Sequence, residues 1–252
     1  MNAFRPGSAW SAVDTREGRV RFQDLHDPDY GYERFTTAPT INGVSVAPEY
    51  PGAPDSTVAR VALPHPLAPG DSCAIALQWE ARLSTVLRRQ GRRGRSYDFA
   101  QWYPKIAVYD RKGWEAPAFT PAGELYGEFG TYDVTLILRP DQIVAATGVV
   151  IAGNPGWGRT LGPSVAVDPG WKAVTFRASN VHHFAWSTSP DYKYEGGTYV
   201  TPSETVAIHI LYRRGDEATW GRGIALRRTK QALAWLESIY GPYAYPQLTN
   251  VH

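Results

Sequence analysis

Apolar side chains recur at every second residue over most of this chain, and this period restricts its fold more than any other feature. In residues 72–80, Ile75, Leu77 and Trp79 alternate with small or polar residues, a pattern typical of a strand with one buried face. The same alternation predicts strands over 20–25, 57–63, 132–138, 144–150, 173–178, 184–188 and 206–212. Gly- and Pro-rich turns between them, including one expected at 195–198, indicate a mostly β fold, an antiparallel sandwich or curved sheet.

The period changes after residue 214. Apolar residues at helical spacing predict one helix over 216–240, with Asp216 and Glu217 at its start and Gly241-Pro242 at its end. A strand is expected to open at Leu248, with no later segment to pair with it. The chain is therefore expected to be cut inside a second domain, which gives a β domain over 1–200 and the start of another domain over 201–252.

Composition narrows the classes of partner. The content of 43% hydrophobic and 20% charged residues is ordinary for a folded protein, and a net charge of +2 is too small to predict a nucleic acid partner. Cys73 is the single cysteine, so an internal disulfide is excluded. No apolar run reaches the roughly 20 residues that a membrane helix needs. The start of the chain lacks a signal-peptide pattern, which leaves localisation open if residues precede Met1.

The sequence offers few catalytic motifs. It contains no His-Glu-x-x-His, no cysteine pair and no Gly-x-Ser-x-Gly, and its six histidines show no ligand spacing and are expected to be structural. The glycine-rich stretch 153–162 lacks the end of a phosphate loop and is expected to be a hairpin loop. The five arginines of 88–95 favour a solvated loop over a nucleic acid grip. Asp98 and Asp110 are a candidate carboxylate pair whose separation the sequence leaves open.

Three segments resemble a known enzyme family. They are Gln101-Trp102-Tyr103-Pro104-Lys105 with the residues up to Asp110, Gly127-Glu128-Phe129-Gly130 leading to Ala146-Thr147-Gly148, and the aromatic-proline segment 240–247. Together with 2–8, they resemble, in order and spacing, a bacterial branch of the gluzincin zinc aminopeptidases, the M1 peptidase family of aminopeptidase N and leukotriene hydrolase. The resemblance extends from Asn2 to the last residue and places missing sequence before Met1 and after His252.

This resemblance implies a fold and a function. The chain would be the antiparallel, saddle-like N-terminal β domain, without its first strands, followed by the first strand and helix of a truncated thermolysin-like α/β domain. The zinc ligands and the general base of such an enzyme would lie in the missing catalytic domain, which is the partner implied in cis. The chain itself would then hold no metal, no catalytic residue and no cofactor, and would be inactive alone, while zinc and a peptide substrate are implied for the full-length protein.

One functional residue is implied within the chain. The family uses a Gln or Glu of its N-terminal domain to hold the free α-amine of the substrate, and Gln101 stands near the equivalent place. The alternative is that Gln101 opens a strand and bonds only to backbone. Trp102, Tyr103, Trp114 and Phe129 are candidates to line the cleft, although core packing is the commoner use of such residues.

Two other classes of function stay open. A non-catalytic β-sandwich that binds peptide or carbohydrate would account for nine Trp and fifteen Tyr residues, and coplanar exposed tryptophans would favour it. A scaffold that braces a catalytic partner would instead show an apolar patch along the helix face of Ala225, Ala232 and Leu236. Uncovered apolar surface would also favour self-association. Substrate preference, and whether the parent is an active peptidase, are left open.

Overall fold

The computed structural model describes residues 2–18, 29–85, 90–120, 126–201 and 204–252. The strand predicted over 20–25 lies outside these ranges, as do His26, Arg88 and Arg89. Within them the fold is mostly β and largely antiparallel, as the alternation predicts. The chain forms two compact units, one of Met1–Arg92 with Tyr103–Glu128 and one of Arg93–Trp102 with Phe129–His252. The predicted boundary near Thr201 falls within the second unit, in the turn between two paired strands, and stays a prediction.

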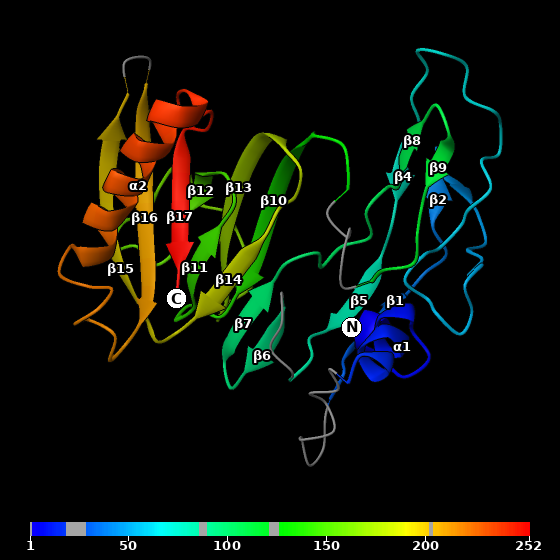
Figure 1. Ribbon diagram of the computed structural model, residues 1–252, viewed down its shortest axis with the longest axis horizontal. Helices are drawn as coiled ribbons and strands as arrows, with labels where there is room; N and C mark the ends of the chain where they lie inside the picture. Colours follow the sequence, from blue (N-terminus) through cyan, green and yellow to red (C-terminus); the bar gives the residue numbers. More distant parts are fainter. Residues whose placement is uncertain (1, 19–28, 86–89, 121–125, 202–203) are drawn as a thin grey trace. The chain divides into compact units, whose positions relative to one another are not determined.

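The first unit is built from short elements (Figure 1). Antiparallel pairing joins β1 to β5, β2 to both β3 and β4, and β8 to β9. The elements are η1 (Asn2–Phe4), α1 (Ala9–Arg16), β1 (Tyr32–Phe35), β2 (Thr40–Ile41), β3 (Val44–Ser45), β4 (Ile75–Ala76), β5 (Trp79–Arg82), β8 (Val108–Asp110) and β9 (Gly113–Glu115).

Helix α1 was not expected from the sequence. Ser8 caps it by accepting from the Ser11 N–H at 3.0 Å, and the Asp55 carboxylate accepts from the Ala9 N–H at 2.7 Å. Trp10 is buried and stacks on Phe119 with ring centroids 5.4 Å apart. Contacts from distant residues therefore stabilise a helix too short to show an apolar period of its own.

The second unit contains longer strands and the second helix. Its sheets have the orders β10-β13-β12, β11-β14-β7-β6 and β15-β16-β17. The elements are β6 (Gly91–Arg93), at which the chain passes from the first unit, β7 (Ser96–Phe99), β10 (Gly130–Leu138), β11 (Ile143–Ala146), β12 (Val149–Gly153), β13 (Lys172–Val181), β14 (Trp186–Ser189), β15 (Tyr192–Val200), β16 (Thr205–Arg213), α2 (Ile224–Tyr240) and β17 (Gln247–Val251).

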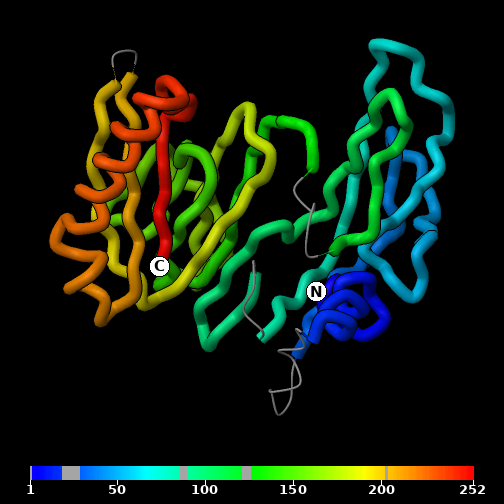
Figure 2. Tube along the Cα trace, viewed as in Figure 1, coloured from blue at the N-terminus to red at the C-terminus, as the bar shows by residue number. Residues whose placement is uncertain are grey.

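The sheet β15-β16-β17 is covered on both faces. On one face Ile208 and Ile210 of β16 pack with Leu233 of α2, whereas Leu211 packs with Ala145 of β11 on the other. Helix α2 lies along this sheet in Figures 1 and 2. The side chains of Ile208, Ile210 and Leu211 have no exposed surface. The strict alternation of β16 thus supplies two cores at once. A chain cut inside a second domain would be expected to leave the residues after 201 poorly anchored, and the burial of β16 contradicts this expectation for that strand.

The final strand also has a partner, contrary to the sequence prediction. β17 runs parallel to β16, with Ala207 opposite Gln247 and Leu211 opposite Val251. Parallel neighbours need a long crossover connection, and α2 supplies it here. The strand β17 lies beside β16 as the red C-terminal segment in Figure 2.

The turn predicted at 195–198 is wrong, because these residues lie in the middle of β15. A Cβ on Gly196 would lie 2.3 Å from the Tyr194 hydroxyl, and one on Gly197 would lie 2.8 Å from the Leu226 side chain. The two glycines make room for packing on opposite faces of the strand rather than for a reversal of the chain.

Other predicted elements were right in kind and wrong in extent. The strand expected at 57–63 is only a bridge between Arg60 and Glu49, and Leu63 at its end is 39% exposed. The run 144–150 is divided at Gly148, whose φ of +86° turns the chain between β11 and β12. The run 72–80 likewise contains β4 and the start of β5, and β14 begins at Trp186. Helix α2 begins at Ile224, so Asp216 and Glu217 precede it.

Candidate functional site

Gln101 follows β7 and lies in an irregular segment rather than at the start of a strand. Its φ of +55° is in the left-handed region, which non-glycine residues rarely adopt. Such outliers concentrate at sites where the surrounding structure imposes them. Gln101 is half-buried and belongs to the second unit.

The residues on both sides of Gln101 are fixed to the same segment, 184–186. Phe99 pairs with Trp186 across β7 and β14, and their rings stack 3.9 Å apart at an interplanar angle of 7°. The indole N–H of Trp102 donates to the Phe184 carbonyl at 2.9 Å. Gln101 therefore lies in a short span between two anchored aromatic residues.

Residues from all three family-like segments meet near this place. Besides Trp102, the hydroxyl of Thr147 accepts from the Ala185 N–H at 3.1 Å, and the Thr147 N–H donates to the Ala185 carbonyl at 2.9 Å. The Tyr245 hydroxyl donates to the Asn180 carbonyl at 3.0 Å. Sequence reasoning did not identify the segment 180–186 as their meeting point, because its own residues carry no motif.

The four aromatic residues predicted to line the cleft differ in burial and in the unit to which they belong. Trp102 is half-buried in the core of the second unit, where its ring also meets Trp186 edge-on at 6.1 Å. Phe129 is exposed, and its ring lies 3.8 Å from that of His182 with the two ring planes tilted by 42°. Tyr103 and Trp114 belong to the first unit. The cleft lining predicted for these four residues stays a prediction, and Trp102 is at least a packing residue.

The two candidate carboxylates have local partners. Asp98 accepts from the Ser187 hydroxyl at 2.6 Å, and Ser187 is also 2.6 Å from the Tyr192 hydroxyl. Burial raises the pKa of Tyr192, so this phenol stays protonated at neutral pH. Asp110 accepts from the Lys112 N–H at 2.8 Å in the β8–β9 turn of the first unit. Each carboxylate thus has a structural use.

Three histidines, His182, His209 and His252, each pack against an aromatic ring. His209 stacks on Trp157 at 4.1 Å, and its Nδ1 is 3.0 Å from the Tyr194 hydroxyl. Burial lowers the pKa of His209 to about 4, which makes it a neutral core residue. Trp157 comes from the glycine-rich stretch, which is the loop between the paired strands β12 and β13, as predicted. His182 and His183 lie in the link after β13 and not within a strand.

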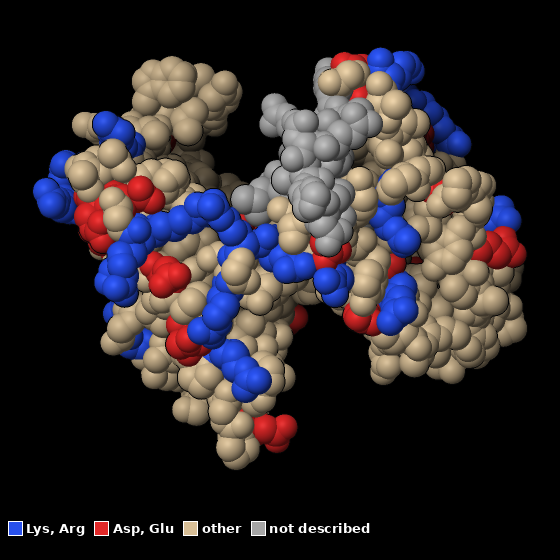
Figure 3. All heavy atoms as spheres, turned by 90° about the horizontal axis from the view of Figure 1, so that it is seen from below, with Lys and Arg blue, Asp and Glu red and all other residues tan. Residues whose placement is uncertain are grey.

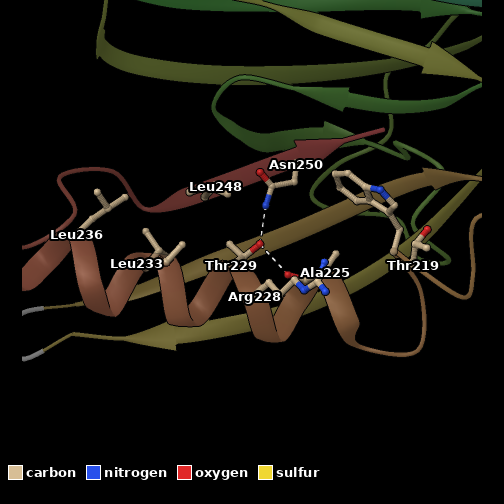
Figure 4. Close-up of a pocket in the computed structure, with 10 residues that line it drawn as sticks. Thr219, Ala225, Arg228, Thr229, Leu233, Leu236, Leu248 and Asn250 are labelled. Carbon is tan, nitrogen blue, oxygen red and sulfur yellow. Dashed lines mark hydrogen bonds between the residues drawn. The ribbon is translucent and has the colours of Figure 1, made fainter.

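Helix α2 and strand β17 enclose an open groove of about 420 Å³ (Figure 4). We call it the α2–β17 groove; its floor carries a hydrogen bond of 2.7 Å from the Asn250 amide to the Thr229 hydroxyl. Arg228 is the one charged residue that lines it, and it makes no ion pair within the described segments. The remaining lining residues are Thr219, Trp220, Ala225, Ala232, Leu233, Leu236 and Leu248.

The apolar surface continues beyond the groove. Along α2, Leu236 is 41% exposed, Ile239 52% and Tyr240 81%. These residues follow Ala225, Thr229 and Leu233 at helical spacing, so one stripe of the helix is buried at its start and open at its end. Of the three residues expected to form the patch of a scaffold, Ala232 and Leu236 are exposed, whereas Ala225 is buried.

Basic side chains lie beside acidic ones on the face shown in Figure 3. Arg95, from the arginine-rich stretch, makes a bidentate ion pair with Asp141 at 2.7 and 2.8 Å. Arg92 bonds to Asp29 at 2.6 Å, and Arg177 pairs with Asp133. Arg92 and Arg95 are thus engaged within the protein.

No protein-family model and no curated protein matches the sequence. The solved structures that it resembles include a two-domain M1 zinc metallopeptidase mutant bound to L-arginine, with 15% identity and a TM-score of 0.56 over 90% of this chain and 49% of that chain. They also include an M1 zinc metallopeptidase from Deinococcus radiodurans, with 17% identity and a TM-score of 0.54 over the same shares of the two chains. A mutant of the Deinococcus radiodurans metallopeptidase bound to a Tyr-Ser-Ala substrate has 16% identity and a TM-score of 0.56, again over 90% and 49%.

The fold is that of part of an M1 zinc metallopeptidase. This agrees with the mostly β, N-terminal-domain fold that the motif segments imply. The chain spans about half the length of the solved structures that it matches.

The residues present do not fit a zinc site of this family. The sequence has no His-Glu-x-x-His, and the described part of the chain contains no group of three His, Cys, Asp or Glu side chains close enough to hold a metal. Nor does the described part contain a helix of the length and hydropathy needed to cross a membrane.

Trp114, Trp171 and Trp235 are exposed, but within the described residues no ring contact joins two exposed tryptophans. Trp10 and Trp157 are buried, and Trp102 and Trp186 pack against Phe99. The exposed pair Tyr109 and Trp114, on the hairpin β8–β9, meets at 66° rather than in one plane. The carbohydrate-binding alternative therefore loses the observation that would have favoured it.

Proposed function

We propose that this chain is the N-terminal, scaffolding and substrate-amine-side part of a zinc-dependent aminopeptidase that removes N-terminal residues from peptides. The observation that supports this most is the fold likeness over 90% of the chain to about half of M1 zinc metallopeptidases. The order of the three motif segments and their meeting near 180–186 add to it. The chemistry itself, with its zinc, belongs to a partner domain in cis, and the chain alone is inactive.

In this proposal Gln101 holds the α-amine of the peptide. Its side-chain oxygen accepts a hydrogen bond from the substrate ammonium, which fixes the register so that one residue is removed at a time. The left-handed backbone at Gln101 supports a functional role, because the conformation is costly for glutamine and is imposed by its neighbours.

The partner domain would dock on the α2–β17 groove and on the open part of the α2 stripe. Three observations support this surface. They are its apolar lining, its continuation over Leu236, Ile239 and Tyr240, and Arg228, which has no ion pair with the described residues and would meet a carboxylate. The matched metallopeptidase described as two-domain is about twice as long as this chain.

The decisive test uses a longer protein that carries this chain and a His-Glu-x-x-His segment. Gln101→Ala should lower kcat/KM for peptides with a free amine by about 10- to 150-fold, as expected for loss of a hydrogen bond to a charged group, with zinc content unchanged. An unchanged kcat/KM would remove Gln101 from the site. The chain alone should not hydrolyse aminoacyl-anilides, and metal analysis should not find one zinc per chain. Hydrolysis by the chain alone, or one zinc retained per chain, would contradict the proposal.

A further inference from the structure

We infer that Trp102 and Phe99 are positioning residues, which hold Gln101 in its left-handed conformation by anchoring both of its flanks to the segment 184–186. The inference rests on the proposed function for its consequence in peptide binding, but the conformation can be tested without it. We call the segment of Phe184, Ala185 and Trp186, to which both flanks are anchored, the platform.

The first anchor is the hydrogen bond from Trp102. Its indole N–H donates to the Phe184 carbonyl at 2.9 Å, and Phe184 is fully buried. Loss of this donor would leave a carbonyl without that partner in the core, which is costly. The position of Trp102 relative to Phe184 is therefore defined by a directional bond and not only by packing.

The second anchor is the stack of Phe99 on Trp186. The two residues are directly opposite in β7 and β14, and their rings are nearly parallel at 3.9 Å. Residues opposite each other across two strands present their side chains on the same face. This stack ends β7 at a defined point, one residue before the irregular segment begins at Ala100.

The platform itself is held from a third direction. Thr147, in the turn between β11 and β12, exchanges hydrogen bonds with both the N–H and the carbonyl of Ala185. Phe184, Ala185 and Trp186 are thus each tied to a different residue, namely Trp102, Thr147 and Phe99. The two residues between Phe99 and Trp102 must join fixed ends, and a left-handed residue at Gln101 satisfies this condition.

The chain offers a matched control. Trp157 also donates its indole N–H to a backbone carbonyl, that of Val144 at 2.8 Å, and it lies in the same hydrophobic core. The ring partners of Trp157 are Phe176, Tyr194 and His209, which lie outside residues 99–102. Trp157→Phe and Trp102→Phe therefore remove the same type of bond, but only Trp102→Phe removes it beside Gln101.

The conformation is measured by NMR on the chain itself, from the three-bond HN–Hα coupling and the α-carbon shift of Gln101. We expect Gln101 to leave the left-handed region in Trp102→Phe and to keep it in Trp157→Phe. If Trp102→Phe does not fold, the same measurement on Phe99→Leu, which keeps apolar volume and loses the stack, decides. A positive φ retained in the folded variant, or lost equally in Trp157→Phe, would overturn the inference.

The second readout is the preference for a free amine in the longer, zinc-bearing protein. The inhibition constants of Tyr-Ser-Ala and its N-acetyl form are compared for each variant. Trp102→Phe should lose about tenfold or more of the preference for the free amine, as Gln101→Ala does, while Trp157→Phe retains it. If Gln101→Ala keeps the preference, the amine-anchor function fails, whereas the NMR result still decides the positioning role. If Gln101→Ala loses the preference and Trp102→Phe keeps it, the positioning role fails.

Discussion

The carboxylate of Glu195, in the middle of β15, accepts a hydrogen bond of 2.8 Å from the backbone N–H of Gly223, the residue that precedes α2. It also accepts from the Arg222 N–H at 2.7 Å. Gly223 is left-handed and has no side chain to cap the helix, so a strand residue supplies the negative charge that a helix N-terminus favours. This arrangement replaces the role predicted for Asp216 and Glu217.

Removal of this distant cap should destabilise the fold. We expect Glu195→Ala to lower the free energy of unfolding by about 1–2 kcal/mol, in the upper range for lost helix caps, in urea denaturation. Glu204→Ala is the control, because Glu204 is an exposed residue at the turn before β16 whose side chain makes none of these bonds. Equal effects of the two substitutions would show that the carboxylate of Glu195 does not cap α2.

Two glycines with similar backbones should differ strongly on substitution. Gly148 and Gly158 have φ of +86° and +80°, but a Cβ on Gly148 would lie 2.3 Å from the Arg177 carbonyl oxygen, while none of the neighbouring atoms comes within 4 Å of a Cβ on Gly158. Gly158→Ala should cost about 1 kcal/mol from the left-handed backbone alone. Gly148→Ala should cost several times more or prevent folding, as measured by thermal denaturation. Similar melting temperatures for the two variants would contradict the close contact at Gly148.

Stability should depend on pH through Glu33. Burial raises the pKa of Glu33 to about 7, and its Oε1 has no hydrogen-bond partner among the described residues. Because the folded-state pKa exceeds the ordinary value, the folded state favours the neutral acid; this contribution is complete below about pH 4.5 and is lost as the pH rises through 7. Glu33 alone should lower the free energy of unfolding by up to about 3 kcal/mol over this interval.

The variant Glu33→Gln separates this group from the others. It should remove the Glu33 contribution to the pH dependence and stabilise the protein most at pH 8, because the neutral amide carries no charge to bury. Urea denaturation at pH 5 and pH 8 measures the difference. A stability gain that is the same at both pH values would contradict the raised pKa.

The open stripe of α2 should promote self-association of the chain. We expect the wild-type chain to form oligomers in sedimentation velocity at tens of micromolar, and Leu236→Lys with Ile239→Lys to shift it toward the monomer. Ile137→Lys, at a 57% exposed position on β10, is the matched control and should leave the oligomers intact. A monodisperse wild-type monomer would show that this stripe is not sufficient for association.

The predictable part of the fold was the part governed by one period. Ile208 and Ile210 lie on one covered face of β16 and Leu211 on the other, and Ala225, Leu233 and Leu236 are spaced as on one side of a helix. The elements β16 and α2 were therefore predicted with only their ends displaced. Gly196 and Gly197 were misread, because a glycine that makes room for a neighbour looks in the sequence like a glycine that turns the chain. Helix α1, with its buried Trp10, was not predicted, because the contacts that stabilise it come from Asp55 and Phe119.

The candidate site was predictable only as a position. Motif resemblance selected Gln101, but the left-handed backbone there depends on Phe184 and Trp186, which are more than 80 residues away and carry no motif. The partner of β17 was missed for a related reason. A parallel neighbour lies on the far side of a helix in the sequence, and local periodicity carries no information about it.

The parallel pair of β16 and β17 sets an order of assembly. β15 and β16 are adjacent in sequence and can close as a hairpin, whereas β17 must wait until α2 has formed and crossed the sheet. On a ribosome, the hydrogen-bonding edge of β16 therefore emerges well before β17, the strand that pairs with it. We expect the interval between the synthesis of residues 213 and 251 to be the period of greatest exposure to aggregation, so that slow translation or interruption within α2 lowers the yield of soluble chain more than the same delay elsewhere.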